Sequence, residues 1–115
     1  MKGQAMKRLA LLMLLAATPA FAHAKLTVSD PAADAKVKTP KMIRLTFSEK
    51  LEPAFSGASL IDPVGKTVPL ASSVAGSGIT LLPLALKPGR YKVAWHSVGQ
   101  DTHPMKGSFS FEVIP

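Results

Sequence analysis

The sequence contains no cysteine among its 115 residues. Disulfides, thiol catalysis and cysteine-ligated zinc are therefore excluded, and the fold must be stable on its hydrophobic core alone. A metal site in this chain has to use nitrogen and oxygen donors. Beyond residue 22, thioether sulfur is available only from Met42 and Met105.

Long hydrophobic runs are also scarce, because the one example, residues 9–17, is too short to cross a membrane as a helix. Basic residues precede this run and small residues follow it, which is the order found in a secretory signal peptide. The basic residues are Lys2, Lys7 and Arg8, and the cleavage site is Ala20-Phe21-Ala22. We therefore expect residues 1–22 to be removed and residues 23–115 to form one small domain outside the cytoplasm, with no direct insertion into the membrane.

Acidic residues are few, since 14 Lys and Arg stand against 7 Asp and Glu, a formal charge of +7. Three of the basic residues lie in the expected signal peptide, so 11 basic and 7 acidic residues remain, a charge of +4. The remaining basic residues are scattered singly and form no patch or basic helix. A nucleic-acid partner is therefore not expected.

No segment has a sustained helical period. Instead, short segments alternate apolar and polar residues, and turn signals recur about every eight to twelve residues. The expected strands are residues 24–29, 42–48, 55–61, 66–70, 79–82, 90–96 and 108–113, with polar or flexible connections at 32–40 and 71–78. The pattern predicts an all-β sandwich or Greek-key barrel of about seven strands, as in Ig-like domains.

The apolar positions of these strands define the expected core. The first strand alternates Leu26 and Val28 with polar residues and should be half-buried. The other inward rows are Ile43, Leu45 and Phe47, then Tyr91, Val93 and Trp95, and finally Phe109, Phe111 and Val113. We expect Trp95 near the centre of this core and functional groups on the loops at one end.

Residues 95–107 carry most of the reactive side chains, including two of the three histidines. Asp101 and His103 are two residues apart, so in extended chain their side chains leave on the same side, and Pro104 favours an extended backbone at His103. One carboxylate and one imidazole would then face one point. A polar hairpin loop with a surface histidine is the alternative.

Removal of the signal peptide would make His23 the first residue of the domain. A terminal histidine offers one ion two nitrogens, the freed α-amine and the ring nitrogen nearer the backbone. If the first strand starts beside the loop that holds Asp101 and His103, the donors become three nitrogens and one carboxylate oxygen. Such a set suits Cu(II), with zinc as the second choice.

Three other side chains have open roles. Glu49 continues the inward row that ends at Phe47, so it would lie at the rim of the core, either solvated or recruited to the site. His96 has outward parity next to Trp95, which favours a surface position over a ligand role. Met105 is expected to fill space in the loop rather than to bind metal.

Several segments together resemble a known family. They are His23-Ala24-Lys25-Leu26, Phe47-Ser48-Glu49 followed by Phe55-Ser56-Gly57-Ala58, Gly89-Arg90-Tyr91-Lys92-Val93 with Trp95, and Asp101-Thr102-His103-Pro104 with Gly107 and the strand from Phe109 to Phe111. This combination spans nearly all of residues 23–115. In it, the sequence resembles the periplasmic copper-binding proteins of the CopC/PcoC type.

The resemblance implies a cupredoxin-like Greek-key β-barrel in the periplasm with a Cu(II) site at one end. It implies His23, Asp101 and His103 as ligands, Glu49 as a nearby acceptor or weak ligand, and an inner-membrane copper permease of the CopD type as a partner. Longer family members hold Cu(I) in a Met-rich loop, whereas residues 61–78 contain neither Met nor His here. Only a Cu(II) site is therefore expected.

We expect a copper-binding protein that sequesters or delivers copper and is not an enzyme. One alternative is a copper-dependent oxidative enzyme of the terminal-histidine type. Against it, the chain is small, has one Tyr and one Trp, and would place a carboxylate where oxygen activation needs an open position. The other alternative is an Ig-like structural or adhesion domain without a metal.

Overall fold

The structure is a computed structural model that describes residues 23–115, so the expected signal peptide lies outside the described residues. Eight strands and one 3-10 turn make up the described part. They are β1 (Leu26–Asp30), β2 (Lys36–Val37), β3 (Ile43–Phe47), η1 (Pro53–Phe55), β4 (Gly57–Ile61), β5 (Ala71–Ala75), β6 (Gly78–Leu82), β7 (Gly89–Val98) and β8 (Pro104–Val113). Within residues 23–115, no helix has the length and apolar character needed to cross a membrane.

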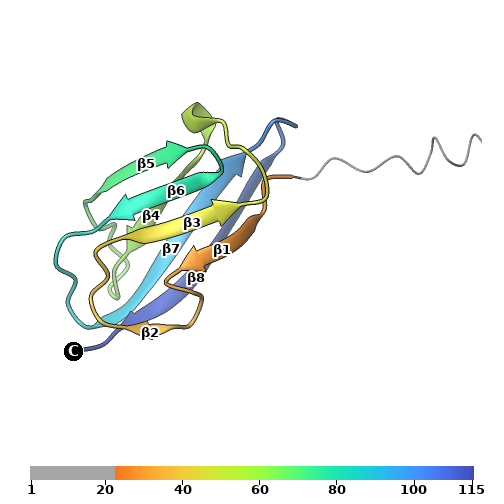
Figure 1. Ribbon diagram of the computed structural model, residues 1–115. Helices are drawn as coiled ribbons and strands as arrows, with labels where there is room; N and C mark the ends of the chain where they lie inside the picture. Colours follow the sequence, from red (N-terminus) through yellow and green to blue (C-terminus); the bar gives the residue numbers. More distant parts are fainter. Residues whose placement is uncertain (1–22) are drawn as a thin grey trace, which may run out of the picture.

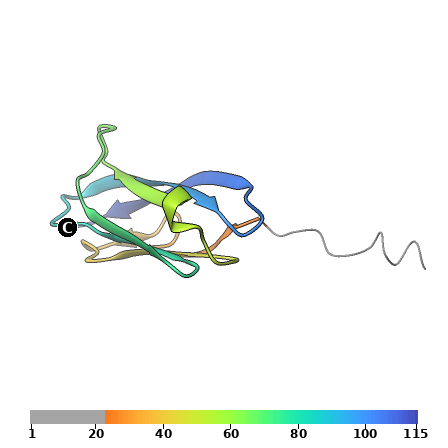
Figure 2. The same cartoon turned by 90° about the horizontal axis from the view of Figure 1, so that it is seen from above.

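The strands form two four-stranded sheets, ordered β1-β3-β6-β5 and β2-β8-β7-β4. The two sheets lie face to face as two layers (Figures 1 and 2). Except at the hairpins β5–β6 and β7–β8, each connection crosses from one sheet to the other. The all-β prediction is confirmed: of the sandwich and the barrel that it allowed, the structure is an open sandwich, with eight strands where about seven were expected.

The core lies between the two sheets and follows the predicted alternation. In β3, Ile43, Leu45 and Phe47 are buried while the two residues between them are exposed. Trp95 was expected near the centre, but it is only partly buried and packs edge-on against Phe47, with ring centroids 5.3 Å apart. Gly107 lies opposite Trp95 in the ladder, and a Cβ there would come within 2.5 Å of the indole ring. Any other residue at position 107 would therefore force the indole ring to shift.

The first strand departs from its predicted pattern. Val28 was expected to face the core but is 60% exposed, whereas Ala24 is fully buried. The pairing between β1 and β3 shifts register between Leu26 and Val28. Because side chains alternate along a strand, one irregular residue transfers those beyond it to the opposite face.

The middle of the chain was predicted less well. Residues 66–70 form only an isolated bridge, between Thr67 and Ile61, and the predicted loop at 71–78 contains β5. Alanine and serine have low strand propensity, but β5 pairs with β6 along its whole length through a turn at Gly76, where φ is 58°. Pairing with a neighbour outweighs local preference here. The predicted connection at 32–40 likewise contains the short strand β2, which pairs with β8.

One end of the sandwich gathers segments from three parts of the chain. The described chain starts there, beside the loop that joins β7 to β8, and β3 ends there as well (Figures 1 and 2). β4 starts at Gly57 rather than at Phe55, which lies in the turn η1 and is 65% exposed. Residues 23–25 therefore lie beside the loop that joins β7 to β8, and His23 contacts Asp101 in that loop.

Candidate metal centre

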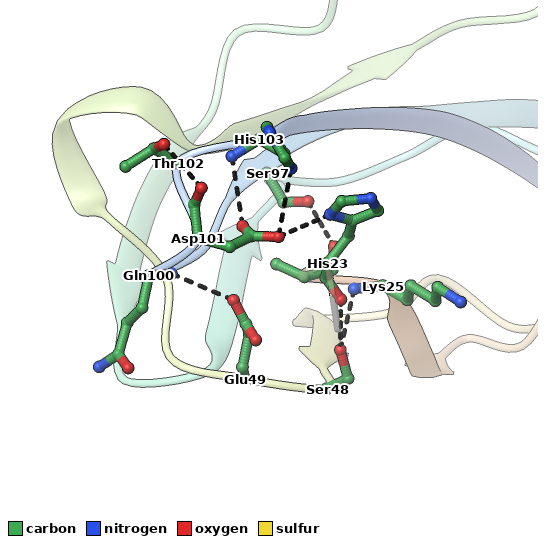
Figure 3. A network of polar contacts seen from close by, with 10 residues as sticks. His23, Lys25, Ser48, Glu49, Ser97, Gln100, Asp101, Thr102 and His103 are labelled. Atoms are coloured by element: carbon green, nitrogen blue, oxygen red, sulfur yellow. Dashed lines mark hydrogen bonds and ion pairs between the residues drawn. The ribbon is translucent and has the colours of Figure 1, made fainter. Parts of the chain in front are cut away.

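Three predicted ligands meet at this end of the sandwich. His23, Asp101 and His103 each offer one ligand atom, and these atoms all lie within 4.8 Å of one another. His23 comes from the segment before β1, and the other two come from the β7–β8 loop (Figure 3). Within residues 23–115, no other group of three such side chains is present.

Asp101 lies between the two histidines. His23 Nδ1–H donates a hydrogen bond of 2.6 Å to Asp101 Oδ2. His103 Nδ1 is 3.7 Å from the same oxygen, which is too long for a hydrogen bond. The backbone N–H of His103 donates to Asp101 Oδ1 at 3.2 Å, and the two imidazole rings meet edge to face with centroids 5.0 Å apart.

The surroundings of Asp101 favour its charged form. The side chain is 7% exposed, and the hydrogen bond from His23 is the main cause that holds its pKa below the ordinary value of 3.8. Burial acts in the opposite direction, while the His103 backbone N–H and the two nearby imidazoles lower the pKa further. Asp101 is therefore an anionic oxygen donor at neutral pH.

The loop reaches this geometry by a turn rather than by extended chain. Thr102, between the two loop residues, has φ of 63°, a left-handed conformation that is uncommon outside glycine. Its N–H donates to Gly99 O at 3.1 Å, and its hydroxyl donates to Asp101 O at 2.6 Å. The extended chain expected from Asp101 to His103 is therefore interrupted at Thr102, although the two side chains do meet.

The Glu49 side chain holds the β7–β8 loop through a hydrogen bond to the loop's backbone. Its Oε1 accepts a hydrogen bond of 3.1 Å from Gln100 N–H. A Cβ on Gly99 would lie 1.8 Å from the same oxygen, so only glycine allows this approach. Glu49 is outside the group of three converging residues.

The other candidate residues lie away from the cluster. His96 is exposed on β7, as its parity predicted, and its ring passes over Gly57, where a Cβ would be 3.1 Å from it. Met42 precedes β3 and is 45% exposed, whereas Met105 is in β8, opposite Ser97. The two methionines therefore belong to different ends of the sandwich.

Sequence reasoning missed two serines that hold the start of the chain. Ser97 is fully buried, and its hydroxyl donates to Ala24 O at 2.6 Å. The Ser48 hydroxyl donates to His23 O at 2.9 Å and accepts from Lys25 N–H at 3.0 Å. Ser97 continues the inward row of β7, so a polar residue at a core position was a usable signal.

The donor set fits a metal ion that prefers nitrogen and oxygen. It contains one anionic oxygen and two imidazoles, without sulfur. The His103 and His23 side chains are 67% and 39% exposed, whereas Asp101 lies beneath them. An ion can therefore reach this site from solvent past the histidines.

Comparison with known proteins gives one consistent result. The CopC domain family matches residues 26–114. The chain is 41% identical over 109 residues to "Copper resistance protein C" of Xanthomonas campestris pv. juglandis, covering 86% of both chains. It is 43% identical over 112 residues to "Protein YobA" of Escherichia coli K12, covering 91% of this chain and 90% of that protein.

Solved structures agree. The crystal structure of CopC from Methylosinus trichosporium OB3b superposes with a TM-score of 0.76 at 31% identity, over 81% of this chain and 95% of that one. The crystal structure of PcoC, a methionine-rich copper resistance protein from Escherichia coli, superposes with a TM-score of 0.70 at 38% identity, over 81% of this chain and 100% of that one.

Proposed function

Because this chain belongs to the CopC domain family, we propose that it binds one Cu(II) ion through His23, Asp101 and His103 and sequesters or delivers it in the periplasm. The observation that carries the proposal is the convergence of these three side chains from two distant segments, with ligand atoms within 4.8 Å. Relatives of this chain include proteins named for copper resistance.

We propose that removal of residues 1–22 completes the site. The α-amine of His23 would then join its Nδ1 in a chelate, the Asp101 carboxylate would give the oxygen donor, and His103 would give the third nitrogen. The ion would replace the proton that His23 Nδ1 now shares with Asp101 Oδ2. Nitrogen-rich donor sets of this kind favour Cu(II) over the other divalent ions.

The proposed role is binding rather than catalysis. Asp101 would occupy a coordination position that an oxygen-activating copper enzyme needs open. Within residues 23–115, Met42 precedes β3 and Met105 lies in β8, at different ends of the sandwich, so this part of the chain offers Cu(I) no thioether cluster. A CopD-type permease in the inner membrane is the proposed recipient or source of the ion.

A titration of the chain that begins at His23 tests this function. Cu(II) is added in competition with a chelator of known affinity, and electron paramagnetic resonance is recorded on the complex. The proposal expects one ion per chain and a tetragonal spectrum dominated by nitrogen donors. Failure of the protein to compete for Cu(II), or a spectrum dominated by oxygen donors, would overturn it.

A further inference from the structure

We infer that Ser48 and Ser97 are positioning residues that fix the first residues of the domain for metal binding, an inference that rests on the proposed function. Neither hydroxyl belongs to the group of converging ligand atoms. Both act on the backbone of residues 23–25, which carries His23.

The two serines hold three consecutive residues. Ser48 Oγ donates to His23 O at 2.9 Å and accepts Lys25 N–H at 3.0 Å, while Ser97 Oγ donates to Ala24 O at 2.6 Å (Figure 3). A backbone hydrogen bond from Ser48 N–H to Lys25 O, 2.8 Å, adds to this set. Each of residues 23–25 is therefore tied to the sandwich.

These contacts matter because residues 23–25 belong to no strand and have no pairing register with a neighbouring strand. It precedes β1, whose first pair with β3 is Leu26 with Phe47. The first residues of a domain usually fray unless something ties them down. Here the segment is held by the two serine hydroxyls, by the backbone hydrogen bond from Ser48 N–H to Lys25 O, and by the methyl group of Ala24, which is fully buried in the core.

The serines also connect the segment to the rest of the site. Ser97 lies near the end of β7, opposite Met105 of β8, at the base of the hairpin that carries Asp101 and His103. Ser48 directly precedes Glu49, which accepts Gln100 N–H in the same loop. The segment that carries His23 and the loop that carries Asp101 and His103 are therefore attached to the same part of the sandwich.

Holding the segment in place before metal arrives reduces the ordering that binding itself requires. Groups that orient metal ligands typically change metal affinity by about 10- to 100-fold when they are removed. Ser48→Ala should therefore weaken Cu(II) binding by about tenfold. Ser48 is exposed, so its removal should leave the folded state intact.

Thr27 provides the matched control. It lies in β1 and its hydroxyl donates to Thr46 O at 3.0 Å, the same kind of exposed contact between the same two parts of the chain. This hydrogen bond does not involve residues 23–25. Thr27→Val removes this hydroxyl with little change of shape, and Ser48→Thr restores a hydroxyl at position 48.

The experiment compares wild type, S48A, S48T and T27V, all beginning at His23. It measures Cu(II) affinity by chelator competition and, in the metal-free proteins, hydrogen exchange at the Lys25 amide. We expect S48A to lose about tenfold in affinity and to exchange faster at Lys25, S48T to recover both, and T27V to match wild type in both. Ser97→Ala, measured in the same way, should follow S48A.

Two results would overturn the inference alone. They are equal affinities for wild type, S48A and S97A, or a loss in T27V as large as that in S48A. Absence of Cu(II) binding by the wild-type protein would instead overturn the proposed function, and this inference with it. The wild-type titration therefore separates the two failures.

Discussion

His23 Nδ1 lies 2.6 Å from Asp101 Oδ2 although 78 residues separate the two in sequence. The contact joins the start of the domain to the β7–β8 loop. A proton occupies the position between a nitrogen and an oxygen that a metal ion would share. The two side chains are therefore already in contact without a metal, and under the proposed function metal binding would exchange this proton for an ion.

The two histidines of the β7–β8 region should differ sharply. His103→Ala removes a side chain that converges with Asp101, whereas His96→Ala removes an exposed ring on the outer face of β7. We expect the first to weaken Cu(II) binding by orders of magnitude and the second by less than about tenfold, or about 1.4 kcal/mol. Chelator competition measures both. Equal losses would contradict the assignment of the loop.

Acidification should release the metal through the nitrogen donors. Imidazole and amine nitrogens bind a metal ion only in their unprotonated forms, whereas the pKa of Asp101 is lowered from 3.8. Cu(II) affinity should therefore fall steeply between about pH 7 and pH 5, where protons compete for nitrogen but not for Asp101. A constant affinity over this range would contradict nitrogen ligation.

Asp101 should also make metal-free stability depend on pH. Because its pKa is lowered in the folded state, its charge stabilises the fold above the ordinary value of 3.8, and this contribution is lost as the pH falls through the lowered pKa. In thermal unfolding, Asp101→Asn should therefore melt at a lower temperature than wild type at pH 6, and the difference in melting temperature should be smaller at low pH. Asp34→Asn, which breaks an exposed ion pair with Arg90, is the control and should change little. A difference in melting temperature between wild type and Asp101→Asn that grows on acidification would contradict this pH dependence.

Two variants of Glu49 distinguish a residue that holds the loop from a residue that binds the metal. Glu49→Gln keeps an oxygen that can accept Gln100 N–H but removes the charge, and Glu49→Ala removes both. If Glu49 only holds the loop, Cu(II) affinity should stay within about threefold, or about 0.7 kcal/mol, in the Gln variant and fall further in the Ala variant. Equal large losses in both variants would indicate direct ligation.

Alternation made much of this fold predictable from sequence. In β3, apolar residues recur at every second position, and the structure buries each of them between exposed neighbours: Ile43, Leu45 and Phe47. Val28 could not be placed in the same way, since the register shift that turns it outward depends on how β1 meets β3. β5 was missed for a related reason: its small residues are a strand only because β6 lies beside them.

The candidate site, like the fold, could be predicted from the sequence only in part. Asp101 and His103 are close in sequence, so their partnership could be inferred, and His23 was linked to them through the expected cleavage and the family resemblance. The Thr102 turn and the hydrogen bonds of Ser48 and Ser97 depend on tertiary contacts. Sequence spacing carries little information about such contacts.

The most direct measurement concerns the start of the domain. One Gly added before His23 would turn its α-amine into an amide and break the proposed chelate, while the change lies outside β1 and the core. Chelator competition and thermal unfolding should be run on the chain that begins at His23 and on the Gly-extended chain. We predict equal stability of the metal-free forms and a loss of about a hundredfold or more in Cu(II) affinity on extension. Unchanged affinity would contradict a role for the amine and leave any copper binding to the loop residues alone.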